Sequence, residues 1–122
     1  MFELKIQTHF AAAHQLAMVA KQCENLHGHN WKVEVMVAGK TLNEAGVLID
    51  FGELKAHVKT IIDQLDHKFL NELEILTCQP SSENIAVHIA ENLQKRLEGT
   101  GVRVSRVTTW ESENAAATYI PD

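Results

Sequence analysis

Apolar and polar residues alternate over the first stretch of the chain. From Phe2 to His14 the large apolar side chains fall on even positions, and most charged and amide side chains fall on odd positions. Because successive side chains of a strand point to opposite faces, this period of two predicts a half-buried β-strand. The same alternation predicts a second strand over residues 30–41. The loop between them, residues 15–29, is long for a compact domain, so we expect it to carry function.

Helical spacing replaces this alternation in the middle of the chain. Apolar residues recur three or four positions apart after Asp50, and they predict a helix over about residues 51–65 with Asp50 as its N-cap. A second apolar stripe predicts a helix that begins near Ser82. Ser81 or Ser82 caps the start of this helix, and Gly99 ends it.

The end of the chain returns to strand-like sequence. Residues 102–112 and 115–120, joined by a short polar turn, predict a closing β-hairpin. The resulting order β-β-α-α-β-β predicts a single α+β domain over residues 1–122. In this fold two helices cover one face of a four-stranded antiparallel sheet.

Composition and charge limit the classes of partner. The chain has 122 residues, of which 45% are hydrophobic and 22% charged, as in an ordinary globular domain. Its formal net charge of −5 gives no general attraction to phosphate backbones or anionic lipids, so we expect neither nucleic acid nor membrane as a partner. No basic segment leads into an apolar run at the start, and no long apolar span follows. We therefore expect a cytoplasmic protein.

The long loop ends in a group of residues that can bind metal. His27 and His29 stand on either side of Gly28, and Cys23 precedes them. Side chains two positions apart on a strand point the same way, about 6 to 7 Å from each other. Two imidazoles at that spacing can hold one metal ion.

Strand phase selects a third ligand. His14 lies on the apolar face of the first strand, in phase with the histidine pair, whereas His9 falls on the polar face. We therefore predict His14 as the third ligand, provided that no bulge between Phe10 and His14 reverses the face. Three histidines without a fourth protein ligand leave a coordination position open, which is typical of catalytic zinc.

The role of Cys23 stays open at this point. As a fourth ligand it would close the site and make the zinc structural. As a thiolate near the cation and the imidazoles, it would instead be a nucleophile or a base.

Three acidic or basic residues elsewhere are further candidates. Asp66 and His67 place a carboxylate beside an imidazole, a pair that suits proton transfer. Alternatively, His67 only interacts with the negative C-terminal end of the preceding helix. Glu111 could accept hydrogen bonds from a guanidine-like edge of a ligand. Alternatively, it is a solvated residue near a turn.

Several motifs follow one another along nearly the whole chain. They are Phe10-Ala11-Ala12-Ala13-His14, Cys23-x3-His27-Gly28-His29, Leu48-Ile49-Asp50-Phe51-Gly52-Glu53-Leu54-Lys55, Leu65-Asp66-His67, Pro80-Ser81-Ser82-Glu83-Asn84 and Glu111. As an ordered set they resemble the 6-pyruvoyl-tetrahydropterin synthase family. The three-residue gap between Cys23 and His27 resembles the 6-carboxytetrahydropterin synthase branch, because pyruvoyl synthases commonly have a longer gap.

The resemblance implies roles for the candidate residues. The zinc ligands are His14, His27 and His29. Cys23 is the catalytic base and not a ligand, and Asp66 with His67 is a dyad that relays protons. Glu111 anchors the amino-pyrimidinone edge of the pterin. Ser82 contacts the substrate, although serines stand at 81 and 82 where the family commonly has a threonine.

The resemblance also implies a reaction and an assembly. The reaction converts 7,8-dihydroneopterin triphosphate to 6-carboxy-5,6,7,8-tetrahydropterin, with release of acetaldehyde and triphosphate, in queuosine (7-deazapurine) biosynthesis. The tunnelling fold of the family joins the sheets of several subunits into a barrel, with helices outside and active sites between subunits. We therefore expect a homo-oligomer, with a hexamer favoured.

Two alternatives accompany this prediction. The first is 6-pyruvoyl-tetrahydropterin synthase activity on the same substrate. The second is a non-catalytic module in which Cys23, His27 and His29 hold a structural zinc.

Overall fold

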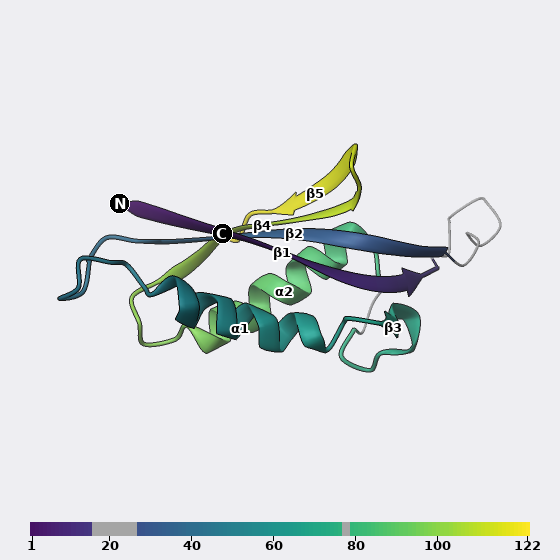
Figure 1. Cartoon of the computed structure of the whole chain (residues 1–122), viewed down its shortest axis with the longest axis horizontal. Coiled ribbons are helices and arrows are strands. Elements are labelled where there is room, and N and C mark those ends of the chain that lie inside the picture. The colour runs from purple at the N-terminus through teal and green to yellow at the C-terminus, as the bar shows by residue number, and fades with distance from the viewer. Residues whose placement is uncertain (16–26, 77–78) are drawn as a thin grey trace.

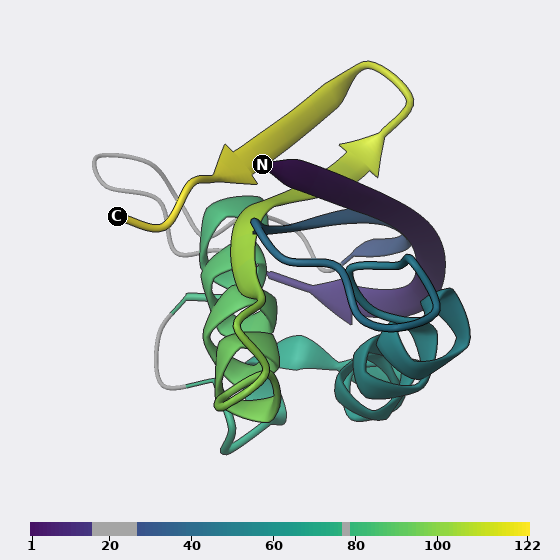
Figure 2. The same cartoon turned by 90° about the vertical axis from the view of Figure 1, so that its left-hand side faces the viewer.

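The computed structural model describes residues 1–15, 27–76 and 79–122. Its elements are β1 (Phe2–His14), β2 (His27–Gly39), α1 (Phe51–Asp63), β3 (Lys68–Phe69), a 3-10 turn (Leu70–Glu72), α2 (Ser82–Arg96), β4 (Arg103–Ser112) and β5 (Ala115–Tyr119). Within these residues the strands form one sheet in the order β3-β1-β2-β4-β5. Both helices lie against the same face of the sheet, as Figures 1 and 2 show.

The α+β class and the helices on one face are confirmed, but the number of strands is corrected. The four predicted strands are β1, β2, β4 and β5, and their pairings are antiparallel. The fifth, β3, is only two residues long and pairs in parallel with Ala12 and Ala13 at the end of β1. A strand this short has too few residues to produce a hydrophobic period, so the sequence pattern could not report it.

The two long strands form a continuous ladder. β1 and β2 pair from Phe2 opposite Gly39 to His14 opposite His27, with no bulge between Phe10 and His14. The phase predicted for β1 therefore holds: Phe10 and His14 are buried, and His9 is exposed. β2 begins three residues earlier than predicted, because the pairing with β1 continues through the histidine pair.

Capping side chains fix the starts of both helices. The side chain of Asp50 accepts a hydrogen bond from the backbone N–H of Glu53 at 3.1 Å, as predicted for α1. For α2 the cap is Ser81, whose Oγ accepts from the N–H of Asn84 at 3.1 Å. Gly99 follows α2 with a φ of 81°, the left-handed conformation that commonly ends helices.

The core lies between the sheet and the two helices. In β2 the side chains of Trp31, Val33, Val35 and Val37 are fully buried. They pack against the apolar stripes of the helices, which include Leu54, Val58, Ile61, Ile85, Ile89 and Leu93. Full burial of one such side chain stabilises the fold by about 1.5–3 kcal/mol. None of the helices in the described residues has the length and apolar character needed to cross a membrane.

Candidate metal centre and active site

His14 ends β1 with its side chain fully buried. Its Nδ1 lies 2.8 Å from the carbonyl oxygen of Pro80, just before α2. Since a carbonyl oxygen can only accept, Nδ1 carries the hydrogen and donates it. The lone pair of a neutral His14 is then on Nε2, so the segment that leads into α2 sets the tautomer and orientation in which this imidazole can bind a metal.

Trp31 supports both histidine rings that the structure describes at this site. His29 and Trp31 are two residues apart on β2 and therefore lie on the same face of the sheet. The Trp31 ring meets those of His14 and His29 edge to face, with centroid distances of 5.0 and 5.4 Å. The same ring stacks on that of Phe10, with a centroid distance of 5.8 Å. This packing limits the rotation of the two imidazoles.

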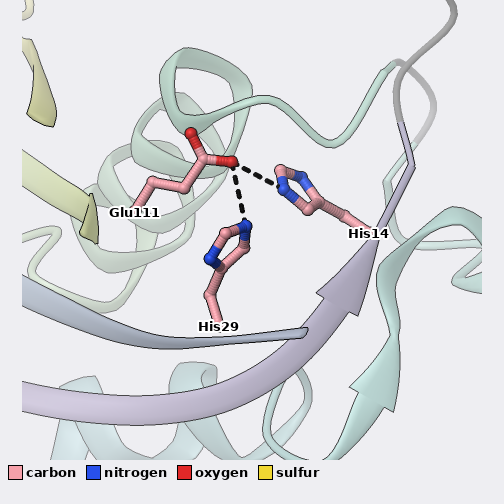
Figure 3. Close-up of side chains that lie close together, drawn as sticks. All are labelled: His14, His29 and Glu111. Atoms are coloured by element: carbon pink, nitrogen blue, oxygen red, sulfur yellow. Dashed lines mark ion pairs between the residues drawn. The ribbon is translucent and has the colours of Figure 1, made fainter. Parts of the chain in front are cut away.

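Glu111 brings a carboxylate to the same point from β4. Its Oε1 lies 2.7 Å from Nε2 of His14 and 3.2 Å from Nε2 of His29 (Figure 3). The ligand atoms of these three residues all lie within 4.8 Å of one another. Two imidazoles and a carboxylate are a donor set that binds zinc, so the group could hold a metal ion.

A bulge accompanies the placement of Glu111. In the pairing of β4 with β5, Trp110 lies opposite Ala116 and Ser112 opposite Ala115, so Glu111 has no opposite residue. A bulge of this kind bends the strand and re-aims side chains. The alternation along β4 was the sequence signal that could have placed Glu111 on the face that carries the histidines. Glu111 follows the buried Val107 and Thr109 at intervals of two.

Asp66 and His67 form a separate pair at the outer edge of β1. The Oδ1 of Asp66 accepts a hydrogen bond from the backbone N–H of Ala11 at 2.9 Å and lies 3.0 Å from Nδ1 of His67. The hydrogen bond from Ala11 is the largest cause that holds the pKa of Asp66 below its usual value. Burial opposes this shift, and the charge of the neighbouring His67 adds to it.

His67 is held in an unusual backbone conformation. Its φ is 59°, in the left-handed region that residues other than glycine rarely adopt, and its N–H donates to the carbonyl of Ala11. Its side chain is 81% exposed. The turn is thus clamped to β1 while the imidazole points outward, and such strained residues often occur at functional sites.

The structure brings together some of the predicted site residues. His14, His29 and Glu111 share one centre, and Asp66 with His67 forms a second group. Cys23 and the side chain of His27 lie outside the described residues, although the backbone of His27 pairs with His14. Ser82 begins α2, and its carbonyl accepts a hydrogen bond from Oγ1 of Thr109 at 2.8 Å, which ties the start of α2 to β4.

Known proteins resemble this chain in both sequence and fold. The family model for 6-pyruvoyl tetrahydropterin synthase matches residues 3–122. A relative from Archaeoglobus fulgidus, provisionally named as a 6-carboxy-5,6,7,8-tetrahydropterin synthase, is 41% identical over 110 residues, which cover 89% of this chain and 87% of the relative. A dihydroneopterin monophosphate aldolase from Pyrococcus furiosus is 38% identical over 102 residues, with coverage of 84% and 82%. The solved 6-pyruvoyl tetrahydropterin synthase of Caenorhabditis elegans has the same fold, with a TM-score of 0.85 at 24% identity over 99% of this chain and 96% of that one.

Proposed function

Because the chain belongs to the 6-pyruvoyl tetrahydropterin synthase family, we propose that it is a zinc-dependent lyase that makes 6-carboxy-5,6,7,8-tetrahydropterin from 7,8-dihydroneopterin triphosphate. Acetaldehyde and triphosphate are the other products, and queuosine biosynthesis is the pathway served. Several relatives at 30% to 41% identity have names that specify the 6-carboxy activity, which supports this branch. The observation that carries the proposal is the centre of His14, His29 and Glu111.

The residues of this centre fit zinc. The hydrogen bond from Nδ1 of His14 to Pro80 leaves Nε2 as the metal-binding nitrogen, and histidine ligands of metals are commonly oriented in this way. We propose His14, His27 and His29 as the ligands. When bound, zinc supplies a Lewis acid that acidifies the C–H beside the side-chain hydroxyls of the substrate.

The protein supplies the groups that move the proton. Cys23 takes the proton from the activated carbon as a thiolate base. Asp66 and His67 relay protons, and their geometry supports this role: the carboxylate faces Nδ1 at 3.0 Å, so a neutral His67 presents the lone pair of Nε2 outward. Ser82 and Glu111 contact the pterin and orient it.

We also propose a homo-oligomer with active sites between subunits, a hexamer being favoured. β5 is the last strand of the sheet, and β3 covers the outer edge of β1 only at Ala12 and Ala13. Edges that pair with no other described strand are sites for pairing with another chain, and closure into a barrel removes them. The 81% exposure of the His67 side chain suits a residue that acts in the site of a neighbouring subunit.

A product assay tests the proposed activity. Zinc-loaded protein is incubated with 7,8-dihydroneopterin triphosphate, and the products are identified by mass spectrometry. Cys78, the second cysteine of the chain, provides the matched control. We expect a carboxypterin, acetaldehyde and triphosphate from the wild type and from Cys78→Ala, and none from Cys23→Ala. If neither carboxypterin nor acetaldehyde forms, the proposed reaction is wrong.

The same assay separates the alternatives. Accumulation of 6-pyruvoyltetrahydropterin would assign the pyruvoyl reaction instead. Because the Pyrococcus furiosus relative is named as a dihydroneopterin monophosphate aldolase, the monophosphate is tested beside the triphosphate. Loss of both folding and zinc in Cys23→Ala would favour a structural zinc site.

A further inference from the structure

We propose that Glu111 is a ligand of the metal ion in the substrate-free protein, and that substrate must displace it. This inference rests on the zinc dependence of the proposed function, but it adds a residue to the ligand set. The family resemblance implied that His14, His27 and His29 are the metal ligands and that Glu111 contacts the pterin. The geometry points to a coordination sphere that Glu111 completes until substrate arrives.

The first argument concerns the two atoms that face each other. Since Nδ1 of His14 donates to Pro80, Nε2 of the neutral ring carries a lone pair. Oε1 of Glu111 also carries lone pairs and lies only 2.7 Å away. Two acceptors at this distance repel each other unless a proton or a metal ion lies between them. A bound metal ion meets that requirement because both atoms become its ligands.

The second argument concerns the spacing of the three atoms. Two ligands that each lie about 2.0–2.1 Å from a tetrahedral zinc ion are about 3.3 Å apart. The contact between Glu111 and His29 is 3.2 Å, close to that value, and the contact with His14 is 2.7 Å. The contact with His29 therefore needs almost no change, and lengthening the contact with His14 by about 0.6 Å would give a tetrahedral coordination geometry. Figure 3 shows both imidazoles directed at the same carboxylate oxygen.

The third argument concerns which ligand can leave. His14 is fully buried and is held by Pro80, so it stays in place. Glu111 is 33% exposed and projects from the bulge in β4, so its side chain has room to turn away from the centre. Hydroxyl groups of a substrate can then occupy the position that the carboxylate vacates. A metal ion held in this way would have no open coordination position at rest and would gain one when Glu111 turns away.

Zinc affinity, measured by competition with a chromophoric chelator, tests the ligand role without an activity readout. We expect Glu111→Gln to weaken zinc binding by at least tenfold. Loss of a residue that only hydrogen-bonds to a metal ligand commonly lowers metal affinity ten- to hundredfold, and loss of a ligand should cost at least as much. Glu111→Asp keeps the charge but withdraws the carboxylate by one methylene group, so it should bind zinc with intermediate affinity. Glu113→Gln, at the exposed turn two residues along the chain, is the matched control and should bind zinc like the wild type.

The cobalt-substituted protein gives a second readout. Its visible spectrum reports the number and type of ligands, so Glu111→Gln should change it and Glu113→Gln should not. Addition of 7,8-dihydroneopterin triphosphate to the wild type should shift the spectrum as well.

The outcomes are distinguishable. If Glu111→Gln keeps its fold and wild-type zinc affinity, the contact is a hydrogen bond from a doubly protonated imidazole and the inference is wrong. If Glu111→Gln does not fold, Glu111→Asp decides, and an unchanged affinity in that variant also overturns the inference. If the wild type itself binds no zinc, the zinc dependence of the proposed function fails instead.

Discussion

The carbonyl of Pro80 accepts a hydrogen bond from Nδ1 of His14 at 2.8 Å, although the two residues are 66 positions apart. The segment that leads into α2 thus orients a histidine at the end of β1. Ser81, the next residue, caps α2 through the N–H of Asn84. The position of the Pro80 carbonyl therefore depends on a helix cap, and the cap helps to orient a proposed metal ligand.

Ser81→Ala should weaken both the fold and the metal site. Loss of the cap costs about 1 kcal/mol of unfolding free energy, which urea denaturation measures. Without the cap the Pro80 carbonyl loses its fixed position, so zinc affinity should fall by about tenfold.

Asp50→Ala is the matched control for this prediction. It removes the equivalent cap of α1, which lies at the end of this helix that is farther from β3 (Figure 1). We expect a similar loss of stability with unchanged zinc affinity. Equal zinc affinity in the two variants would contradict the link between Pro80 and His14.

Asp66→Asn should change how stability depends on pH. The folded state lowers the pKa of Asp66, chiefly through the hydrogen bond from Ala11, so ionised Asp66 stabilises the fold above its unfolded pKa. That contribution disappears as the pH falls from about 4 through the lower folded pKa. The variant should therefore be less stable than the wild type at pH 7, and the difference should shrink as the pH falls below about 4.

Urea denaturation across this pH range checks the prediction. Asp63→Asn is the control, because the exposed pair of Asp63 with Lys59 at 2.7 Å should be worth no more than about 0.5 kcal/mol. A difference between Asp66→Asn and wild type that stays constant from pH 7 to pH 3 would show that the carboxylate charge is not the cause.

His88 should produce a second pH dependence, nearer neutrality. Its Nε2 is buried without a hydrogen-bond partner in the described residues, and the amide of Asn92 lies 3.3 Å from Nδ1. Burial lowers the pKa of His88, with Glu91 opposing and Lys95 adding to the shift. The unfolded chain therefore binds a proton more readily than the fold, and stability is lost as the pH falls below about 6.5.

His88→Gln should flatten this part of the stability profile between pH 5 and 7.5. Glu91→Gln should steepen it, since the charge of Glu91 raises the His88 pKa. Parallel profiles for the wild type and His88→Gln would exclude His88 as the source.

The sequence predicted those features that depend on local periodicity. β1 has the bounds that its alternation indicates, and its phase puts His14 on the buried face because no bulge interrupts the pairing with β2. The starts of both helices follow from capping side chains, which act within three residues of the cap. These features are local, so one stretch of sequence contains the information.

The features that escaped prediction arise from contacts between distant segments. The bond between His14 and Pro80 depends on how α2 packs under the sheet, which no local pattern reports. Glu111 near a turn resembled a solvated residue or a ligand contact, whereas its position beside His14 follows from the pairing of β4 and its bulge. The two-residue strand β3 forms because the hydrogen bond between Asp66 and Ala11 holds the preceding turn against β1.

Mixing two inactive variants should restore activity if active sites lie between subunits. Cys23→Ala and His67→Ala each remove one proposed proton-transfer group, so each should be inactive alone. In a mixed oligomer, some sites take Cys23 from one chain and His67 from its neighbour, and both groups are then wild type. Random assembly at equal concentrations should make about a quarter of the sites active. Each site takes Cys23 from one chain and His67 from another, and each chain has an even chance of carrying the wild-type residue.

Native mass spectrometry first establishes the oligomer and the presence of mixed assemblies, and the product assay then measures the recovered activity. A mixture of Cys23→Ala with Cys23→Ser is the control and should stay inactive at every ratio. If confirmed mixed oligomers of the two test variants remain inactive, the dyad of Asp66 and His67 serves its own subunit. In that case its 81% exposed imidazole would have to reach Cys23 within one chain, and the proposed site between subunits would be wrong.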